Sequence, residues 1–351
     1  MDSQRKIQFA LEWALDNFLG LLNPRSRLII ENRFGIGSNS EPQTLESIGE
    51  GYSITRERVR QIEQDALRII KESDEYKSGQ TVRKMLKAIF EEKDQLLLEN
   101  ELLLSISEDK KIQNKILFFI TLDDDFIKWK DDDICLAHWS INRDLSCKVH
   151  SSIEQLYTEL SDTKLIDESE IIYRFLKVLE TSGVTFKRKE TTLRWLGFSK
   201  NIVKNPLGEW GKDITNGAKV SGVKDYAYLV LKKNAVPMHF GEIAKAIKAT
   251  FNIPCNTATC HNELIKDDRI VLVGRGTYAL SENGYTPGFA RDVIRELLKK
   301  EGALSKNEII SKVLEKRVLQ QNTILAALQD PACFKKDTQG KYSPVAIEKV
   351  N

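Results

Sequence analysis

The chain has 351 residues, 53 basic and 51 acidic side chains, and a formal net charge of +2 at pH 7. Its 41% hydrophobic share is enough for several small cores, and without a run of eighteen apolar residues we expect no membrane-spanning helix. Five cysteines without a Cys-x-x-Cys pair argue against a disulfide framework and a structural zinc site, and favour a cytoplasmic compartment.

The charge is distributed unevenly along the chain. Residues 90–150 carry fourteen acidic and eight basic side chains, whereas residues 286–345 carry seven acidic and eleven basic ones. This asymmetry indicates that a polyanion would bind particular segments and not the whole surface.

The N-terminal quarter predicts helices separated by a tight turn. Residues 5–33 show helical periodicity, with a second helix starting at Asn23–Pro24. Two further helices are expected from Thr44 to Glu50 and from Arg56 to about Lys71, with Thr55 as N-cap of the second. The predicted buried stripe of that helix is Val59, Ile62, Ala66 and Ile69, and the opposite face carries Arg56, Glu57, Arg60 and Gln61.

The remaining chain predicts more helices and short hairpins. Helical periodicity continues through 79–120, a strand pair is expected near 126–139, and helices near 150–160, 168–180 and 190–197. The last third repeats one pattern of three helices and a hairpin, in which Glu242 corresponds to Glu308 and Tyr278 to Tyr342. That layout is typical of a winged helix.

We therefore predict a mainly α fold, with an N-terminal helix-turn-helix followed by several winged-helix domains. The predicted domains are 1–78 (helix-turn-helix), 79–148 (candidate winged helix), 149–215 (degenerate winged helix and linker), 223–283 (winged helix) and 284–351 (second C-terminal repeat).

The string Thr-Arg-Glu-Arg-Val-Arg-Gln-Ile-Glu at 55–63, with the turn before it, resembles region 4 of sigma-70 family RNA polymerase sigma factors over residues 20–72. The resemblance implies that the second helix of the pair enters a major groove of promoter DNA and reads the −35 element. The residues expected to contact bases are Arg56, Glu57 and Gln61. Those expected to contact the DNA backbone or support the helix are Thr44, Thr55, Arg58 and Arg60.

The same resemblance implies a contact with the core of RNA polymerase. In the family an apolar surface of the first helices docks on the polymerase β-flap, and Leu28, Ile29 and Phe34 are the candidates here. No segment resembles the part of a sigma factor that melts the −10 element, so a complete sigma factor is not expected. An alternative interpretation of residues 55–71 is a surface helix stabilised by its own ion pairs.

Residues 223–281 resemble the HARE-type helix-turn-helix, a winged-helix module also found in the delta subunit of bacterial RNA polymerase. The resemblance is carried by Pro-Met-His-Phe-Gly-Glu-Ile at 237–243 and Val-Gly-Arg-Gly-Thr-Tyr-Ala-Leu at 273–280. Arg275 lies in the turn of the predicted hairpin and is a candidate contact to the DNA backbone.

No catalytic residue, metal site or cofactor is predicted. Cys255, Cys260 and His261 are too few for a metal site, and no catalytic constellation or phosphate-binding loop is present in the sequence. We expect a non-enzymatic transcription factor that binds double-stranded promoter DNA and the RNA polymerase core, with no membrane and no small-molecule substrate. The alternatives are a stand-alone repressor or nucleoid-type protein, and a protein-interaction adaptor.

Overall fold

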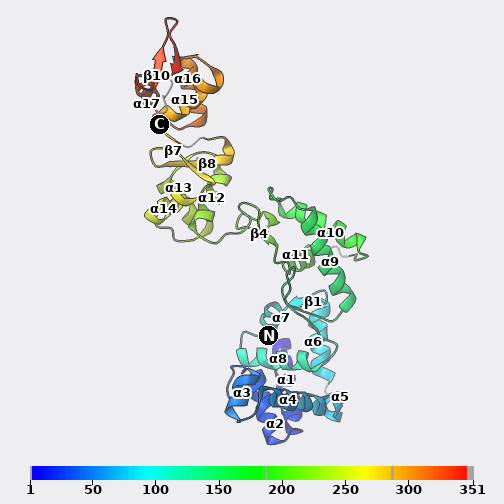
Figure 1. The fold of residues 1–351 in the computed structure, drawn as a ribbon. Helices are drawn as coiled ribbons and strands as arrows, with labels where there is room; N and C mark the ends of the chain where they lie inside the picture. The colour runs from blue at the N-terminus through cyan, green and yellow to red at the C-terminus, as the bar shows by residue number, and fades with distance from the viewer. Residues whose placement is uncertain (1, 79, 186–187, 286–287, 346–351) are drawn as a thin grey trace. The chain divides into compact units, whose positions relative to one another are not determined.

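The structure is a computed structural model that describes residues 2–78, 80–185, 188–285 and 288–345. Within them the chain is mainly helical, with small antiparallel sheets of two or three strands (Figure 1). None of the described helices is long and apolar enough to cross a membrane. Internal contacts divide the chain into two units: unit 1 holds most residues up to Asp213, and unit 2 most of those from Ile214 onwards.

Unit 1 begins with five helices and continues through two mixed segments. The five helices are α1 (Asp2–Gly20), α2 (Pro24–Phe34), α3 (Leu45–Gly51), α4 (Arg56–Glu72) and α5 (Asp74–Ser78). The next segment holds α6 (Gln80–Glu92), β1 (Leu96–Leu98), α7 (Glu99–Ile106), α8 (Lys110–Leu122), β2 (Ile127–Trp129) and β3 (His138–Ser140). The last holds α9 (Arg143–Glu159), α10 (Glu168–Thr181), α11 (Lys189–Leu196), β4 (Ile202–Lys204) and β5 (Trp210–Lys212).

The largest core of unit 1 joins the N-terminal helices to the segment that follows them. Its buried side chains run from Ile7 to Ile70 and again from Val82 to Trp139. Phe18 of α1, for example, lies against Phe119 of α8 with ring centroids 5.6 Å apart. Helices α1, α2, α4 and α5 therefore share this core with α6–α8. Residues 145–210 contribute most of a second core.

Unit 2 consists of two consecutive modules. The first holds α12 (Val223–Asn234), β6 (Met238–His239), α13 (Phe240–Phe251), α14 (Thr257–Lys266), β7 (Ile270–Gly274), β8 (Thr277–Leu280) and the 3-10 turn η1 (Ser281–Asn283). The second holds α15 (Ala290–Glu301), β9 (Leu304–Ser305), α16 (Lys306–Lys316), α17 (Gln321–Leu328), β10 (Phe334–Lys336) and β11 (Lys341–Pro344). The backbone amide of Val318 donates to the carbonyl of Val273 at 3.2 Å, which ties the second module to the first hairpin.

One order of elements recurs along the described chain: helix, short strand, two helices, then a hairpin. It occurs over α6–β3, α12–β8 and α15–β11, and in each sheet the last strand lies between the first and the second. Segment α9–β5 follows the same order, with the single bridge between Ile166 and Trp210 in place of its first strand. The sequence predicts the hairpins of the three three-stranded sheets, but it treats the β4–β5 hairpin as a linker. It also misses the first strand of each three-stranded sheet, because these strands are only two or three residues long.

The correspondence between Glu242 and Glu308 also has a structural basis. Each carboxylate accepts a hydrogen bond from the backbone amide at the start of its own helix, Glu242 from His239 at 3.2 Å and Glu308 from Ser305 at 2.8 Å. These are capping boxes, which fix where the second helix of each module begins. The structure thus gives the repeated glutamate a local role in helix initiation.

Candidate nucleic-acid interface

Helices α3 and α4 form a compact helix-turn-helix on α2. Ile29 of α2, Ile48 of α3 and Val59 of α4 are fully or almost fully buried and form a small core of their own. The turn brings α3 so close to the start of α4 that a Cβ on Gly49 would lie 2.7 Å from the carbonyl oxygen of Ile54. Glycine at 49 is therefore required by this close approach, because no other side chain fits there without a shift of the backbone.

Both helices begin at the threonine that the sequence indicates. The hydroxyl of Thr44 accepts from the amide of Ser47 at 3.1 Å, and that of Thr55 accepts from the amide of Arg58 at 3.2 Å. Each bond satisfies one of the amides left free in the first turn of a helix. Thr44 and Thr55 therefore stabilise the starts of the two helices, and both are exposed at the surface.

The predicted buried stripe of α4 is correct except at its C-terminal end. Val59 and Ala66 are buried and Ile62 is half-buried, but Ile69 is 41% exposed and its neighbour Ile70 is fully buried. A spacing of 3.6 residues per turn carries the buried face from Ala66 to residue 70, where it joins the larger core. The prediction of Ile69 is thus wrong by one residue.

The exposed face at the start of α4 carries all five predicted polar residues. Glu57 forms an ion pair with Arg60, whose Nε lies 2.9 Å and Nη2 2.6 Å from the two carboxylate oxygens. Arg58 donates from Nη1 to Oε1 of Gln61 at 3.1 Å. Arg56 has no hydrogen-bond or ion-pair partner among the described residues. The first turn of α4 therefore presents one unengaged cation beside two side chains held in place by neighbouring arginines.

The Glu57–Arg60 pair also keeps the glutamate ionised. The hydrogen bond from Arg60 holds the pKa of Glu57 below its ordinary value, and the positive charges of Arg60 and Arg56 act in the same direction. An ionised carboxylate accepts hydrogen bonds and donates none, which is the form needed to accept from an amino group on a base edge. The ion pair with Arg60 is compatible with contact to a base, because each carboxylate oxygen of Glu57 can accept a second hydrogen bond.

Two further carboxylates lie close to this face. A shallow depression between α3 and α4 is lined by Glu46 and Glu50 on one side and by Arg56 and Arg58 on the other. Negative charge on α3 repels phosphate, so contacts with a nucleic-acid backbone near the turn are expected from the α4 side.

The apolar surface that sequence comparison suggests for a polymerase contact is largely covered by the chain itself. Leu28 is 46% exposed, but Ile29 is fully buried in the helix-turn-helix core. Phe34 is partly buried and packs edge-on against Phe118 of α8, with ring centroids 5.2 Å apart. Ile29 is therefore corrected as a contact residue, because the helix-turn-helix core buries it, and Phe34 is partly covered by the larger core.

Arg275 lies in the turn between β7 and β8 and is exposed. Gly276 after it has φ of +66°, a left-handed conformation that favours glycine, and a Cβ there would lie 2.8 Å from the His239 ring. The hairpin therefore turns tightly against the start of α13 and projects Arg275 towards solvent.

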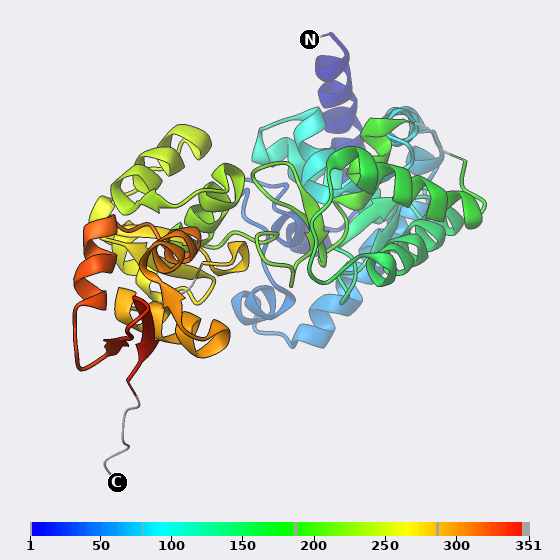
Figure 2. The ribbon, with the colours of Figure 1, turned by 90° about the horizontal axis from the view of Figure 1, so that it is seen from above.

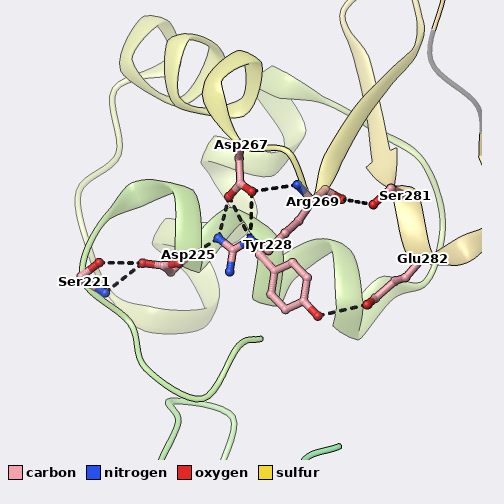
Figure 3. A network of polar contacts seen from close by, with 7 residues as sticks. All are labelled: Ser221, Asp225, Tyr228, Asp267, Arg269, Ser281 and Glu282. Atoms are coloured by element: carbon pink, nitrogen blue, oxygen red, sulfur yellow. Dashed lines mark hydrogen bonds and ion pairs between the residues drawn. The ribbon is translucent and has the colours of Figure 1, made fainter. Parts of the chain in front are cut away.

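A buried charge network fixes the base of this hairpin (Figure 3). Arg269, just before β7, donates to both carboxylate oxygens of Asp267 and, at 2.8 Å, to Asp225 of α12. Its guanidinium also lies 4.6 Å from the centre of the Tyr228 ring. Burial alone would raise the pKa of both carboxyl groups, but their hydrogen bonds, Arg269 among the donors, hold each pKa below its ordinary value.

The sequence did not single out Asp225, Asp267 or Arg269, because Asp225 lies 44 residues before Arg269 and each residue type is common on surfaces. Only the pairing in space shows that they are one unit.

Among the residues weighed for metal binding, Cys260 is buried in the module core, and this burial raises the pKa of its thiol to about 12. The described residues hold no group of three or more side chains suited to a metal ion.

The comparisons with known proteins concern the helix-turn-helix. Residues 18–72 match the family model of sigma-70, region 4. The chain is 47% identical over 53 residues to RNA polymerase principal sigma factor HrdD of Streptomyces coelicolor, which is 15% of this chain and 16% of that protein. It is 46% identical over 54 residues to RNA polymerase sigma factor SigA of Microcystis aeruginosa, covering 15% and 13%.

A third relative, RNA polymerase sigma factor RpoD of Helicobacter pylori, is 38% identical over 77 residues, which is 22% of this chain and 11% of that protein. The chain thus spans less than one fifth of the length of these curated relatives. Residues 18–72 of this chain are thus a sigma-70 region 4 domain.

Proposed function

We propose that the chain is a DNA-binding transcription factor that reads promoter DNA of the −35 type with α4 and acts together with bacterial RNA polymerase. The observation that carries the proposal is the exposed, Thr55-capped start of α4, which presents Arg56, Glu57 and Gln61 within the segment that matches sigma-70 region 4. The N-terminal residues of such a second helix are the ones that meet base edges in a major groove.

Each of the three side chains has a matching partner on the bases. An arginine such as Arg56 bridges O6 and N7 of guanine, a glutamate such as Glu57 accepts from N4 of cytosine, and a glutamine such as Gln61 pairs with adenine. Arg58 and Arg60 hold Gln61 and Glu57 in the free protein, and in the complex we assign them to phosphate contacts or to the same support.

For the last third of the chain we propose a winged-helix module of the HARE type at 223–283 and a second winged-helix repeat at 284–351, acting as delta-like accessory elements. The order of three helices and a hairpin over α12–β8 and α15–β11 supports this proposal. The exposed turn of the first hairpin makes Arg275 its candidate contact with the DNA backbone.

A second candidate function is a stand-alone DNA-binding regulator without polymerase contact. The burial of Ile29 and the packing of Phe34 on Phe118 favour it, because they leave Leu28 as the exposed member of the apolar set. It keeps the same readout by α4 and differs only in the partner.

The test uses the full chain, because the N-terminal helices share their core with α6–α8. Binding of the full-length protein to purified core polymerase of its host is measured, alone and with a duplex that carries a −35 element or a shuffled sequence. We expect binding to the polymerase and a preference for the −35 duplex. A preference for the −35 duplex without binding to the polymerase selects the stand-alone regulator. Equal binding to both duplexes contradicts base readout.

A further inference from the structure

Helix α1 carries an exposed stripe that none of the observations above explains. Lys6, Phe9, Trp13 and Asp16 recur at steps of three, four and three residues, so they lie along one face of the helix. Phe9 is 72% and Trp13 58% exposed, and all four side chains are classed as exposed. Figure 2 shows the first turns of α1, in blue beside the letter N, projecting beyond the helices around them.

An apolar groove of about 500 Å³ lies directly beside the stripe. Its walls are formed by α1 and α6, and its lining includes Ala10 and Ala14 of α1 and Thr81, Val82 and Met85 of α6. Small side chains at Ala10, Ala14 and Thr81 leave the space, while the two aromatic rings stand beside it. One patch thus contains both the protruding aromatic groups and a hollow that accepts such groups.

The charges along the stripe are complementary to those of a second copy of the stripe that runs in the opposite direction. Lys6 lies at its N-terminal end and Asp16 at its C-terminal end, with Phe9 and Trp13 between them. When two copies of α1 lie antiparallel, Lys6 of each faces Asp16 of the other, and Phe9 of each faces Trp13 of the other. A two-fold symmetric interface requires such reciprocal pairing.

We propose that the chain forms a homodimer through antiparallel pairing of α1, with the aromatic side chains of each copy seated in the groove between α1 and α6 of the other. A second copy is the occupant that the charge order selects, because a partner of a single charge would be repelled at one end of the stripe. The patch involves one stripe and one groove, so we expect a weak dimer with a Kd in the micromolar range. The proposal does not rest on DNA binding.

Sedimentation equilibrium of the full chain over a wide concentration range tests the dimer. We expect reversible dimers, and a Kd raised by about a hundredfold in Trp13→Ala, since both copies lose the ring. Leu104→Ala is the matched control, because Leu104 is 62% exposed on α7 and lies outside the patch. A chain that stays monomeric at every concentration, or a Kd that Trp13→Ala leaves unchanged, overturns the proposal.

Charge exchange gives a second test that does not depend on the aromatic residues. Lys6→Asp and Asp16→Lys each place like charges at both ends of the interface, so each variant alone should bind itself about tenfold more weakly. Mixing the two variants places opposite charges at both ends, and the heterodimer should regain the Kd of the unchanged protein. Failure of the mixture to regain it rules out the antiparallel register, and circular dichroism verifies that each variant is folded.

Discussion

The side-chain amide of Asn114 on α8 lies 2.9 Å from the carbonyl oxygen of Gly35, a residue 79 positions earlier in the chain. The same nitrogen donates to the carbonyl of Ser40 at 2.7 Å. Asn114 is almost completely buried, and Gly35 ends α2 in a left-handed conformation with φ of 62°. The loop that leads into the helix-turn-helix is therefore fastened by a residue outside the segment that matches sigma-70 region 4.

We expect Asn114→Ala to destabilise this loop by about 2 kcal/mol, because two carbonyl groups at a buried site lose their donor. Asn114→Asp should be worse, since an ionised carboxylate would face two carbonyl oxygens. Hydrogen exchange of the Gln43 amide, which donates to Asn32, reports on the loop. Gln113→Ala is the control, because the side-chain amide of Gln113 donates to the carbonyl of nearby Ser107. Unchanged exchange in Asn114→Ala would show that the anchor is not needed.

Gly49→Ala should destabilise the helix-turn-helix by about 1–3 kcal/mol, because the added Cβ would lie 2.7 Å from the carbonyl oxygen of Ile54. Gly51→Ala, two residues later in the same helix, has open space around the new Cβ and should cost little or stabilise slightly. Urea unfolding followed by circular dichroism compares the two. Equal effects of both changes would contradict the close approach at Gly49.

Arg56→Ala should weaken binding to a −35-type duplex by about 1–3 kcal/mol and reduce the preference over a shuffled duplex, because the side chain is assigned to a base. Fluorescence anisotropy with the full chain measures both affinities. Arg68→Ala is the control on the same helix, where Arg68 pairs with Asp65 and Glu72 away from the first turn. An equal loss of affinity for both duplexes would assign Arg56 to the DNA backbone instead.

Arg60→Ala should raise the pKa of Glu57 towards its ordinary value, because the hydrogen bond from Arg60 is the largest cause of the lowered pKa. NMR titration of the Glu57 side chain measures the change. The stabilisation that the Glu57–Arg60 pair provides is present above the unfolded-state pKa of Glu57 and is lost as the pH falls through its folded-state pKa.

Arg60→Ala should also flatten the salt dependence of DNA binding by about one counterion if Arg60 contacts a phosphate. An unchanged slope assigns it to support alone.

Arg269→Met should destabilise the first module of unit 2 by about 3 kcal/mol, because the buried carboxylates of Asp225 and Asp267 lose their shared cation. Both carboxyl groups have a lowered pKa, so their contribution is present at neutral pH and is lost as the pH falls below about 4, where unfolded aspartate takes up protons. Hydrogen exchange of the β7 and β8 amides measures the effect. Arg275→Ala, in the exposed turn of the same hairpin, should leave it unchanged.

The sequence was informative where the determining interactions are local. Thr44 and Thr55 cap helices through bonds to amides three residues later, and the Glu57–Arg60 pair spans one helical turn. Such contacts follow from spacing alone, so the helix-turn-helix and its polar face could be predicted. The roles of Arg56 and Gln61 on DNA stay predictions until binding is measured.

What the sequence could not determine depends on residues brought together from far along the chain. Nothing local indicates that Asn114 holds Gly35, that Phe118 covers Phe34, or that Arg269 joins two aspartates into one network. These contacts exist only once the cores have formed, because burial decides which polar groups need a partner and which apolar faces remain exposed. The sequence alone determined the capped helices and the polar face of α4. The tertiary structure decided that α6–α8 pack against the helix-turn-helix and that the aromatic stripe of α1 is left open.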